Sequence, residues 1–133
     1  AEAGIRLLVD EWVAVDDAFY VVGRNDRSNG PAPLEQVMQG IDPSRPILLI
    51  DHQPDRLDEA IAAGADLQVS GHTHRGQVWP GRLLTARIFE VDWGYLARDG
   101  TQFIVSGGWG TWGPPIRVGS RSEIVQITLR FAP

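Results

Sequence analysis

Apolar residues come in short runs separated by glycine, proline and acidic turns, a spacing typical of strands rather than of long helices. The run Ile47–Ile50 is unbroken, as expected for a strand buried on both faces, and Leu67–Ser70 is a second such run. Between them, Pro54 opens a segment in which Leu57 and Ile61 lie four positions apart, which predicts a helix. We therefore expect a β-α-β unit with two parallel strands, the signature of an α/β fold.

The remaining pattern predicts further strands around this unit. Asp16-Asp17 and Asp99-Gly100 are typical of hairpin turns, and Pro33 suits the first turn of a short helix to Gln39. The other expected strands are Ile5–Val9, Trp12–Val15, Phe19–Gly23, Arg87–Asp92, Tyr95–Ala97, Gln102–Ser106 and Glu123–Phe131. We expect antiparallel or mixed strands in the C-terminal third, and a single domain over residues 1–133.

Composition excludes several classes of protein. A hydrophobic content of 43% and a charged content of 22% over 133 residues are typical of a globular domain. The net charge of −5 without a basic run argues against nucleic acid as the main partner, and the absence of cysteine excludes disulfides and thiolate metal sites. No apolar stretch approaches the roughly 20 residues that cross a bilayer, so we expect no membrane segment and a cytoplasmic location.

The histidines are the most informative residues in the chain. His52 directly follows the first strand of the β-α-β unit, and His72 and His74 directly follow the second. Ligand sites of open α/β sheets form where parallel strands end, and imidazole is the commonest metal ligand among side chains. We therefore predict a divalent transition metal (Mn, Zn, Fe or Ni) on these three residues. Asp51 and Asp66 could orient the imidazoles or add an oxygen ligand; the alternative is that the histidines only cap strand ends.

Two groups of residues near the histidines are candidates for substrate contact. Arg75, beside the ligands, could bind a phosphate by a charge-assisted bond, although a solvated surface arginine fits the sequence equally well. Arg24, Asn25 and Asp26 follow the strand that ends at Gly23 and could line the same cleft. Ordinary turn chemistry is the favoured role for these three.

The glycine-rich loop near the C-terminus contains Trp109 and Trp112. These rings could form an aromatic wall for a substrate, but packing is the favoured role. Arg117 and Glu123 follow the loop, and we expect them to form a structural ion pair rather than to act in catalysis.

Two segments carry a family resemblance. Residues 47–55, Ile-Leu-Leu-Ile-Asp-His-Gln-Pro-Asp, and residues 66–77, which contain Gly-His-Thr-His, resemble the second half of a calcineurin-like metallophosphoesterase domain. Residues 107–117 and 122–125 resemble the end of the same domain. The resemblance implies half of a four-layer α/β/β/α sandwich, in which two metals bind between two sheets and a bridging hydroxide attacks phosphorus.

The resemblance assigns His52 and His72 to one metal and His74 to the other. The chain lacks the motifs that open this family's domain, namely Asp-x-His, Gly-Asp and Gly-Asn-His. The family's catalytic histidine lies in the last of them, so the catalytic residue is unknown here, and we expect a truncated domain. Three histidines match the ligand count of a catalytic zinc site with one open position, so the number of ions expected is one or two.

Three hypotheses follow from this half-complete motif set. The first is an active metal-dependent hydrolase of small-molecule phosphate esters, either diesters or monoesters, working as a homo-oligomer. The second is a metal-binding but catalytically silent half-domain that needs the missing half or a partner. The third is a binding or structural module in which the histidines have lost their role.

Overall fold

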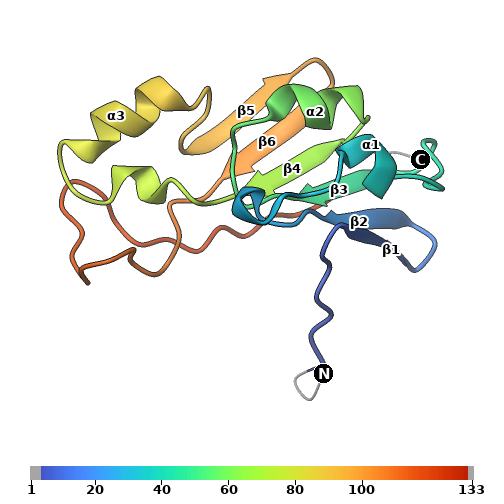
Figure 1. Ribbon diagram of the computed structural model, residues 1–133, viewed down its shortest axis with the longest axis horizontal. Helices are drawn as coiled ribbons and strands as arrows, with labels where there is room; N and C mark the ends of the chain where they lie inside the picture. The colour runs from blue at the N-terminus through green and yellow to red at the C-terminus, as the bar shows by residue number, and fades with distance from the viewer. Residues whose placement is uncertain (1–3, 132–133) are drawn as a thin grey trace.

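The computed structural model describes residues 4–131, which form a six-stranded mixed sheet with three α-helices (Figure 1). The elements in chain order are β1 (Glu11–Val15), β2 (Phe19–Gly23), α1 (Leu34–Val37), β3 (Ile47–Ile50), α2 (Leu57–Ala62), β4 (Leu67–Ser70), α3 (Gly81–Ile88), β5 (Gly94–Arg98) and β6 (Thr101–Val105). Short 3-10 turns lie at Arg27–Asn29 and His74–Gly76.

Four strands of the sheet run parallel. The strand order is β1-β2-β3-β4-β6-β5, in which β2, β3, β4 and β6 pair in parallel and the two outer strands pair antiparallel. Helices α1 and α2 each cross from one parallel strand to the next. The predicted α/β class, the β-α-β unit and the mixed sheet are confirmed. The four parallel strands also bring their carboxyl ends to one edge of the sheet, which positions the site described below.

Both predicted hairpins are present, and their turn residues explain them. Asp16 and Asp17 have φ angles of 47° and 52°, the two left-handed positions of a type I′ turn between β1 and β2. Asp99 and Gly100, with φ angles of 50° and 89°, connect β5 to β6 in the same way. Acidic and glycine residues tolerate this backbone better than branched ones, so the sequence specifies both turns.

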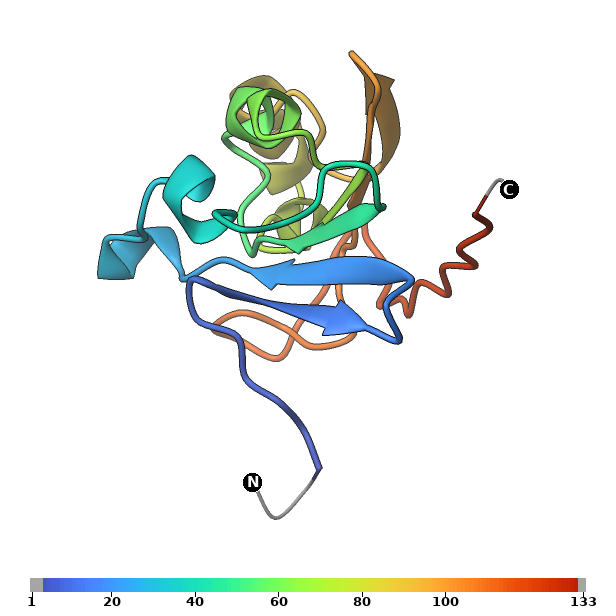
Figure 2. The same cartoon turned by 90° about the vertical axis from the view of Figure 1, so that its right-hand side faces the viewer.

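One face of the sheet is covered by α1 and α2, and the hydrophobic core lies between (Figure 2). Its centre is formed by side chains that register across the parallel strands: Val22, Leu49 and Phe103 are 0%, 0% and 1% exposed. Leu34 and Leu57 close this core from the helices. Full burial of such side chains is the main stabilising contribution of this half of the molecule.

The opposite face of the sheet is also apolar, and within residues 4–131 no helix packs on it. Ile50 is 46% exposed and Tyr95 is 62% exposed there. The C-terminal segment crosses this face, and the ring of Phe131 stacks on Phe19 at 5.4 Å between centroids. Within the described residues, this apolar face of the sheet is therefore only partly covered.

Three strand predictions are wrong. Ile5–Val9 is a mostly apolar run and Glu123–Phe131 alternates apolar and polar residues, yet neither pairs with the sheet, and Leu7 is 80% exposed. The predicted strand Arg87–Asp92 begins inside α3. Leucine, alanine and arginine favour helix, and with no neighbouring strand to pair with, this local preference decides.

Among the described residues, none of the helices has the length and apolar character required to cross a membrane.

Candidate functional site

The carboxyl ends of the parallel strands carry the polar residues of the candidate site. Arg24 follows β2, the pair Asp51-His52 follows β3, and Gly71-His72 follows β4. Gly107 lies in the loop after β6. The sequence therefore predicted correctly that the segments containing the histidines meet at one edge of the sheet, because parallel neighbours end on the same side.

His52 and His72 face each other at this edge. The Nδ1 atom of His72 lies 3.2 Å from the Nε2 atom of His52, and the ring planes are 84° apart. The backbone N–H of Gly71 donates to the carbonyl of His52 at 3.1 Å, which fixes the two loops to each other. Two nitrogens bound about 2.1 Å from one tetrahedral ion lie roughly 3.4 Å apart, so the observed spacing fits two ligands of a single metal.

The environments of His72 and His74 favour the neutral form of both rings. Partial burial lowers the pKa of His72 below its ordinary value, and the neighbouring His52 lowers it further. Burial likewise lowers the pKa of His74, followed by the positive charge of Arg117. A metal binds the lone pair of a neutral imidazole, so these shifts leave the rings in the form that acts as a ligand near neutral pH.

The backbone of the histidine loop is strained. His72, His74 and Arg75 have φ angles of 66°, 48° and 51°, all in the left-handed region that disfavours residues with a side chain. Each such residue costs on the order of 1 to 3 kcal/mol and persists only where surrounding contacts hold it. Clusters of this kind are typical of functional sites, because they aim side chains that a regular strand or turn would point elsewhere.

The side chain of Thr73 holds this loop in place, and no role was predicted for it from the sequence. Thr73 is buried, whereas its neighbours His72 and His74 are exposed and half-buried, respectively. The hydroxyl donates to the carbonyl oxygen of Asp92 at 2.6 Å and accepts from the backbone N–H of Arg75 at 3.2 Å. A threonine between two histidines was the only signal in the sequence, and its partner 19 residues away could not be inferred from it.

Thr73→Val should lower the free energy of unfolding by about 1 to 3 kcal/mol, because the isosteric change leaves a buried carbonyl and a backbone N–H without partners. Thr73→Ser keeps the hydroxyl and serves as the matched control. Chemical denaturation measures the loss, and hydrogen exchange at the Arg75 amide should become faster only in the valine variant. Equal stability of the valine and serine variants would show that the hydroxyl does not hold the loop.

His74 lies apart from the pair. Its Nδ1 atom is 3.5 Å from Nη2 of Arg117, whose guanidinium also donates to the carbonyls of His74, Gly107 and Gly108. Across residues 4–131, the structure brings together no group of three or more His, Asp or Glu side chains that could hold an ion by itself. The described residues therefore assemble two of the three predicted ligands, with the third held against a fixed positive charge.

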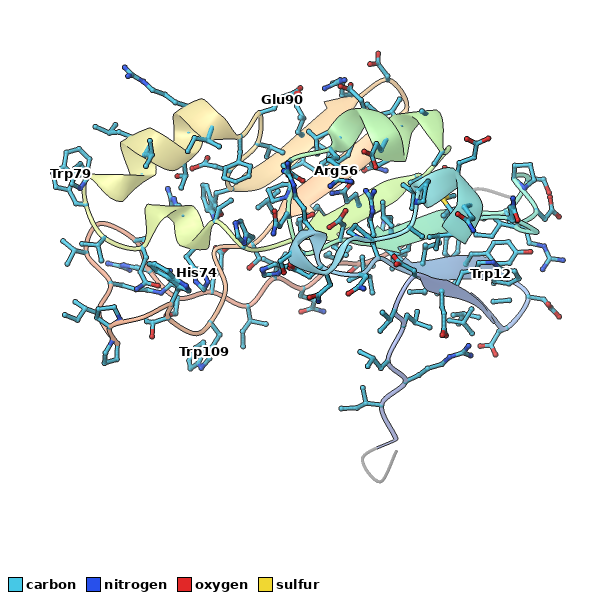
Figure 3. The ribbon with its side chains drawn as sticks, in the orientation of Figure 1. Trp12, Arg56, His74, Trp79, Glu90 and Trp109 are labelled. Atoms are coloured by element: carbon cyan, nitrogen blue, oxygen red, sulfur yellow. The ribbon has the colours of Figure 1, made fainter. Side chains whose placement is uncertain are left out.

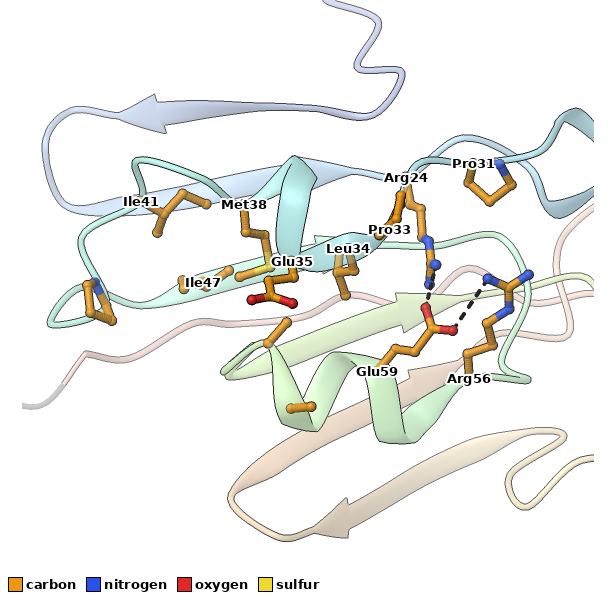
Figure 4. A pocket seen from close by; sticks show the side chains of 13 residues that line it. Arg24, Pro31, Pro33, Leu34, Glu35, Met38, Ile41, Ile47, Arg56 and Glu59 are labelled. Carbon is orange, nitrogen blue, oxygen red and sulfur yellow. Dashed lines mark hydrogen bonds and ion pairs between the residues drawn. The ribbon is translucent and has the colours of Figure 1, made fainter.

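Asp51 is held by arginine rather than directed at the histidines. Its carboxylate is buried, accepts from Nη1 of Arg24 at 3.4 Å and accepts from the backbone N–H of Gln53 at 3.2 Å. Burial raises the pKa of Asp51, and the bond from Gln53 and the charge of Arg24 oppose that rise. Arg24 and Arg56 both donate to Glu59 at one end of a cleft of about 640 Å³ beside α1 and α2 (Figure 4). This network supports the loop that carries His52.

The remaining candidates lie elsewhere or are engaged in other contacts. Asp66 precedes β4, at the opposite end of the sheet from the histidines, and accepts from the backbone N–H of Ile47 at 2.7 Å. The Oδ1 atom of Asn25 accepts from the N–H of Asp26, which is the turn chemistry favoured from the sequence. The guanidinium of Arg75 lies over the ring of Trp93, 3.6 Å from its centroid. None of these geometries points to a metal ligand.

The expected ion pair between Arg117 and Glu123 is wrong. Arg117 donates to backbone carbonyls of the glycine-rich loop, whereas Glu123 accepts from Nε1 of Trp93 at 2.8 Å and from the N–H of Gly107 at 2.6 Å. The sequence does not indicate which backbone groups a side chain will bond, so these contacts of Arg117 and Glu123 could not be predicted.

Trp109 and Trp112 are 72% and 75% exposed, which is contrary to the packing role expected for them.

Comparisons with known proteins find metallophosphoesterases among the relatives of this chain. Over 137 aligned positions the chain is 32% identical to an uncharacterized metallophosphoesterase of Aquifex aeolicus, covering 97% of this chain and 52% of that protein. It is 37% identical to a bovine transmembrane protein with a metallophosphoesterase domain, over 75% of this chain and 23% of the relative. An uncharacterized metallophosphoesterase of Helicobacter pylori is 36% identical over 72% of this chain and 26% of its own length.

The chain thus spans between 23% and 52% of the length of these three relatives. No family model matches the chain. No solved structure matches it either.

Proposed function

This chain belongs to the metallophosphoesterase family, and we propose that it supplies the histidine side of a metal site that hydrolyses phosphate esters. The observation that carries the proposal is the pair of ring nitrogens, on His52 and His72, that approach to 3.2 Å at the carboxyl edge of the parallel strands. The proposed substrates are small-molecule phosphodiesters or phosphomonoesters. In this proposal the chain forms a single truncated domain, which corresponds to half of a four-layer sandwich.

The proposed cofactor is a divalent transition metal, Mn, Zn, Fe or Ni, with one or two ions bound. His52 and His72 would bind the first ion, and His74 would bind a second one. Bound there, an ion would polarise a phosphoryl oxygen and lower the pKa of its water. The chain's own residues hold the imidazoles in place: Arg24 fixes the carboxylate of Asp51, and the hydroxyl of Thr73 fixes the loop between the other two histidines.

The alternative function is a metal-binding but catalytically silent half-domain. The observation that favours it is that residues 4–131 gather only two of the ligands near one point. Two-metal chemistry needs further ligands to hold two ions about 4 Å apart. In this alternative, those ligands come from another segment of the protein or from a partner.

Metal-loaded protein assayed on an aryl phosphodiester tests both functions. We expect His72→Ala to lower the rate of hydrolysis by about 100-fold or more, because it removes one of the two ligands of the same ion. Replacing a residue that only supports a metal ligand already lowers metal affinity or activity by about 10- to 100-fold. Gln53→Ala, next to His52 but outside the ring pair, is the matched control and should leave the rate within a few-fold.

Metal content measured on the same samples separates the functions. A stoichiometric ion that is lost in His72→Ala, without hydrolysis in the parent chain, establishes the silent half-domain. Protein that binds none of the four metals contradicts both functions and favours the structural module. His74→Ala should keep the first ion and lose the second.

We also propose a homo-oligomer in the cytoplasm. The partly covered apolar face of the sheet, where Ile50 and Tyr95 are exposed, supports self-association, since burying such a face stabilises a pair of subunits. Light scattering on the assay sample gives the mass directly.

A further inference from the structure

A second surface beside the histidine edge exposes large apolar side chains. On α3, Leu83, Leu84 and Ile88 are 57%, 61% and 62% exposed. In the glycine-rich loop, Trp109 and Trp112 are 72% and 75% exposed. Single exposed apolar residues are ordinary, but a contiguous group marks a binding surface. The first question is whether the helix and the loop form one surface.

Hydrogen bonds join the two segments. Val78 and Val118 form a parallel bridge, and the N–H of Trp79 donates to the carbonyl of Val118 at 2.9 Å. The side chain of Gln77 is buried and bonds both the carbonyl and the N–H of Trp112, each at 2.6 Å. Trp79 and Trp109 accordingly lie at the same end of the molecule as His74 (Figure 3). Residues 74–89 and 107–121 are therefore adjacent at this end of the molecule (Figure 1), and together they are here called the tryptophan–arginine surface.

The charge of this surface is opposite to that of the chain. The protein has a net charge of −5, with 12 basic and 17 acidic residues. The two segments contain five arginines and no acidic residue. Three acids lie next to these segments: Asp92 accepts from Thr85, Glu90 accepts from Arg98, and Glu123 accepts from Trp93 and the backbone, so the five arginines outnumber the neighbouring carboxylates. Arg82, Arg87 and Arg121 are exposed. An apolar surface with an excess of positive charge is complementary to a partner that is both anionic and apolar.

We propose that the tryptophan–arginine surface docks on an anionic lipid bilayer. Tryptophan is enriched at the level of lipid head groups, because its ring is apolar and its N–H remains polar. A short helix that exposes leucine and isoleucine lies in the bilayer interface, and arginines beside it bind lipid phosphates. The chain then binds membranes from one side, without a spanning helix. The side chains proposed to contact the bilayer are tryptophan, leucine, isoleucine and arginine; His74 only borders the surface, so the docking can be tested separately from the proposed function.

Vesicle co-sedimentation tests the docking. The full chain should bind vesicles of phosphatidylglycerol and phosphatidylcholine, bind pure phosphatidylcholine much more weakly, and lose affinity as salt rises. Each arginine near an anionic surface contributes about fivefold, so Arg82→Glu with Arg87→Glu should weaken binding by at least about 25-fold. Leu83→Ser with Leu84→Ser should weaken it on both lipid compositions, because it removes the apolar contact.

The matched control is Arg6→Glu with Arg130→Glu, which makes the same charge change at exposed arginines outside the surface. It should retain binding within a few-fold. His72→Ala should bind vesicles as well as the parent chain does, so loss of metal and loss of docking can be told apart.

Four outcomes overturn the proposal. The first is that the chain does not sediment with anionic vesicles, and the second is that it binds both lipid compositions equally. The third is that the control pair loses as much vesicle affinity as the surface variants do. The fourth is that the chain binds a single-stranded oligonucleotide more tightly than it binds vesicles. A dimer that dissociates in the two surface variants without any vesicle binding would show instead that the surface pairs with a second copy. Circular dichroism confirms that each variant is folded; if the serine pair does not fold, the charge-reversal pair decides.

Discussion

Replacing Arg24 by methionine should lower the free energy of unfolding by about 3 to 5 kcal/mol, the usual cost of removing one partner of a buried ion pair. The side chain of Arg24 is only 3% exposed and donates to Asp51 and Glu59. Methionine fills much of the same volume, so lost packing contributes little. The main cost is the buried carboxylate of Asp51, which keeps its bond from Gln53 but loses its counter-charge.

Arg27→Met is the matched control. Arg27 also pairs with an aspartate, Asp55, but its side chain is 57% exposed. Solvent screens such a pair, and exposed ion pairs contribute about 0 to 1 kcal/mol. The same substitution at two arginines, each paired with an aspartate, therefore isolates the effect of burial.

Urea denaturation of both variants measures the difference. The double variant Arg24→Met with Asp51→Asn should recover part of the loss, because it removes the unpaired charge along with its partner. If Arg24→Met costs no more than Arg27→Met, the Arg24–Asp51 pair is not buried as the structure has it. An unchanged cost in the double variant would assign the loss to packing instead.

The parallel part of the fold was predictable because its signals are local. An unbroken apolar run followed by a helix and a second run indicates two parallel strands, and β3 and β4 lie where Ile47–Ile50 and Leu67–Ser70 predict. The strand prediction for Glu123–Phe131 failed for the opposite reason. Its alternation would suit a strand, but a strand needs a partner, and the described residues offer none at that place.

The meeting of the segments that carry the histidines was predictable, but the geometry of their side chains was not. His52 and His72 were brought together by the register of two parallel strands, which the sequence indicates. The place of His74 depends on its left-handed backbone and on Arg117, which lies 43 residues further along the chain. Asp66 was assigned to the site from its nearness in sequence. A strand of four residues separates it from the histidines and places it at the other end of the sheet.

Gly76→Ala should destabilise the protein by about 2 to 5 kcal/mol, combining a left-handed backbone penalty of 1 to 2 with an overpacking cost of 1 to 3. Gly76 ends the histidine turn with a φ of 69°. An added Cβ atom would overlap the backbone of Gly81 and Arg82 at the start of α3. Backbone atoms cannot swing aside as a flexible side chain can, so either the turn or the helix must move.

Gly64→Ala separates the two costs, since Gly64 has a φ of 78° and open space around its Cβ position. It should lose only about 1 to 2 kcal/mol, the backbone penalty alone. Urea denaturation gives both values, and hydrogen exchange across α3 should become faster only in the Gly76 variant. Equal losses at the two glycines would mean that the turn and α3 are not packed together. A larger loss at Gly76 would show that the histidine loop and the first turn of α3 are one rigid unit, so displacing the helix also displaces His74.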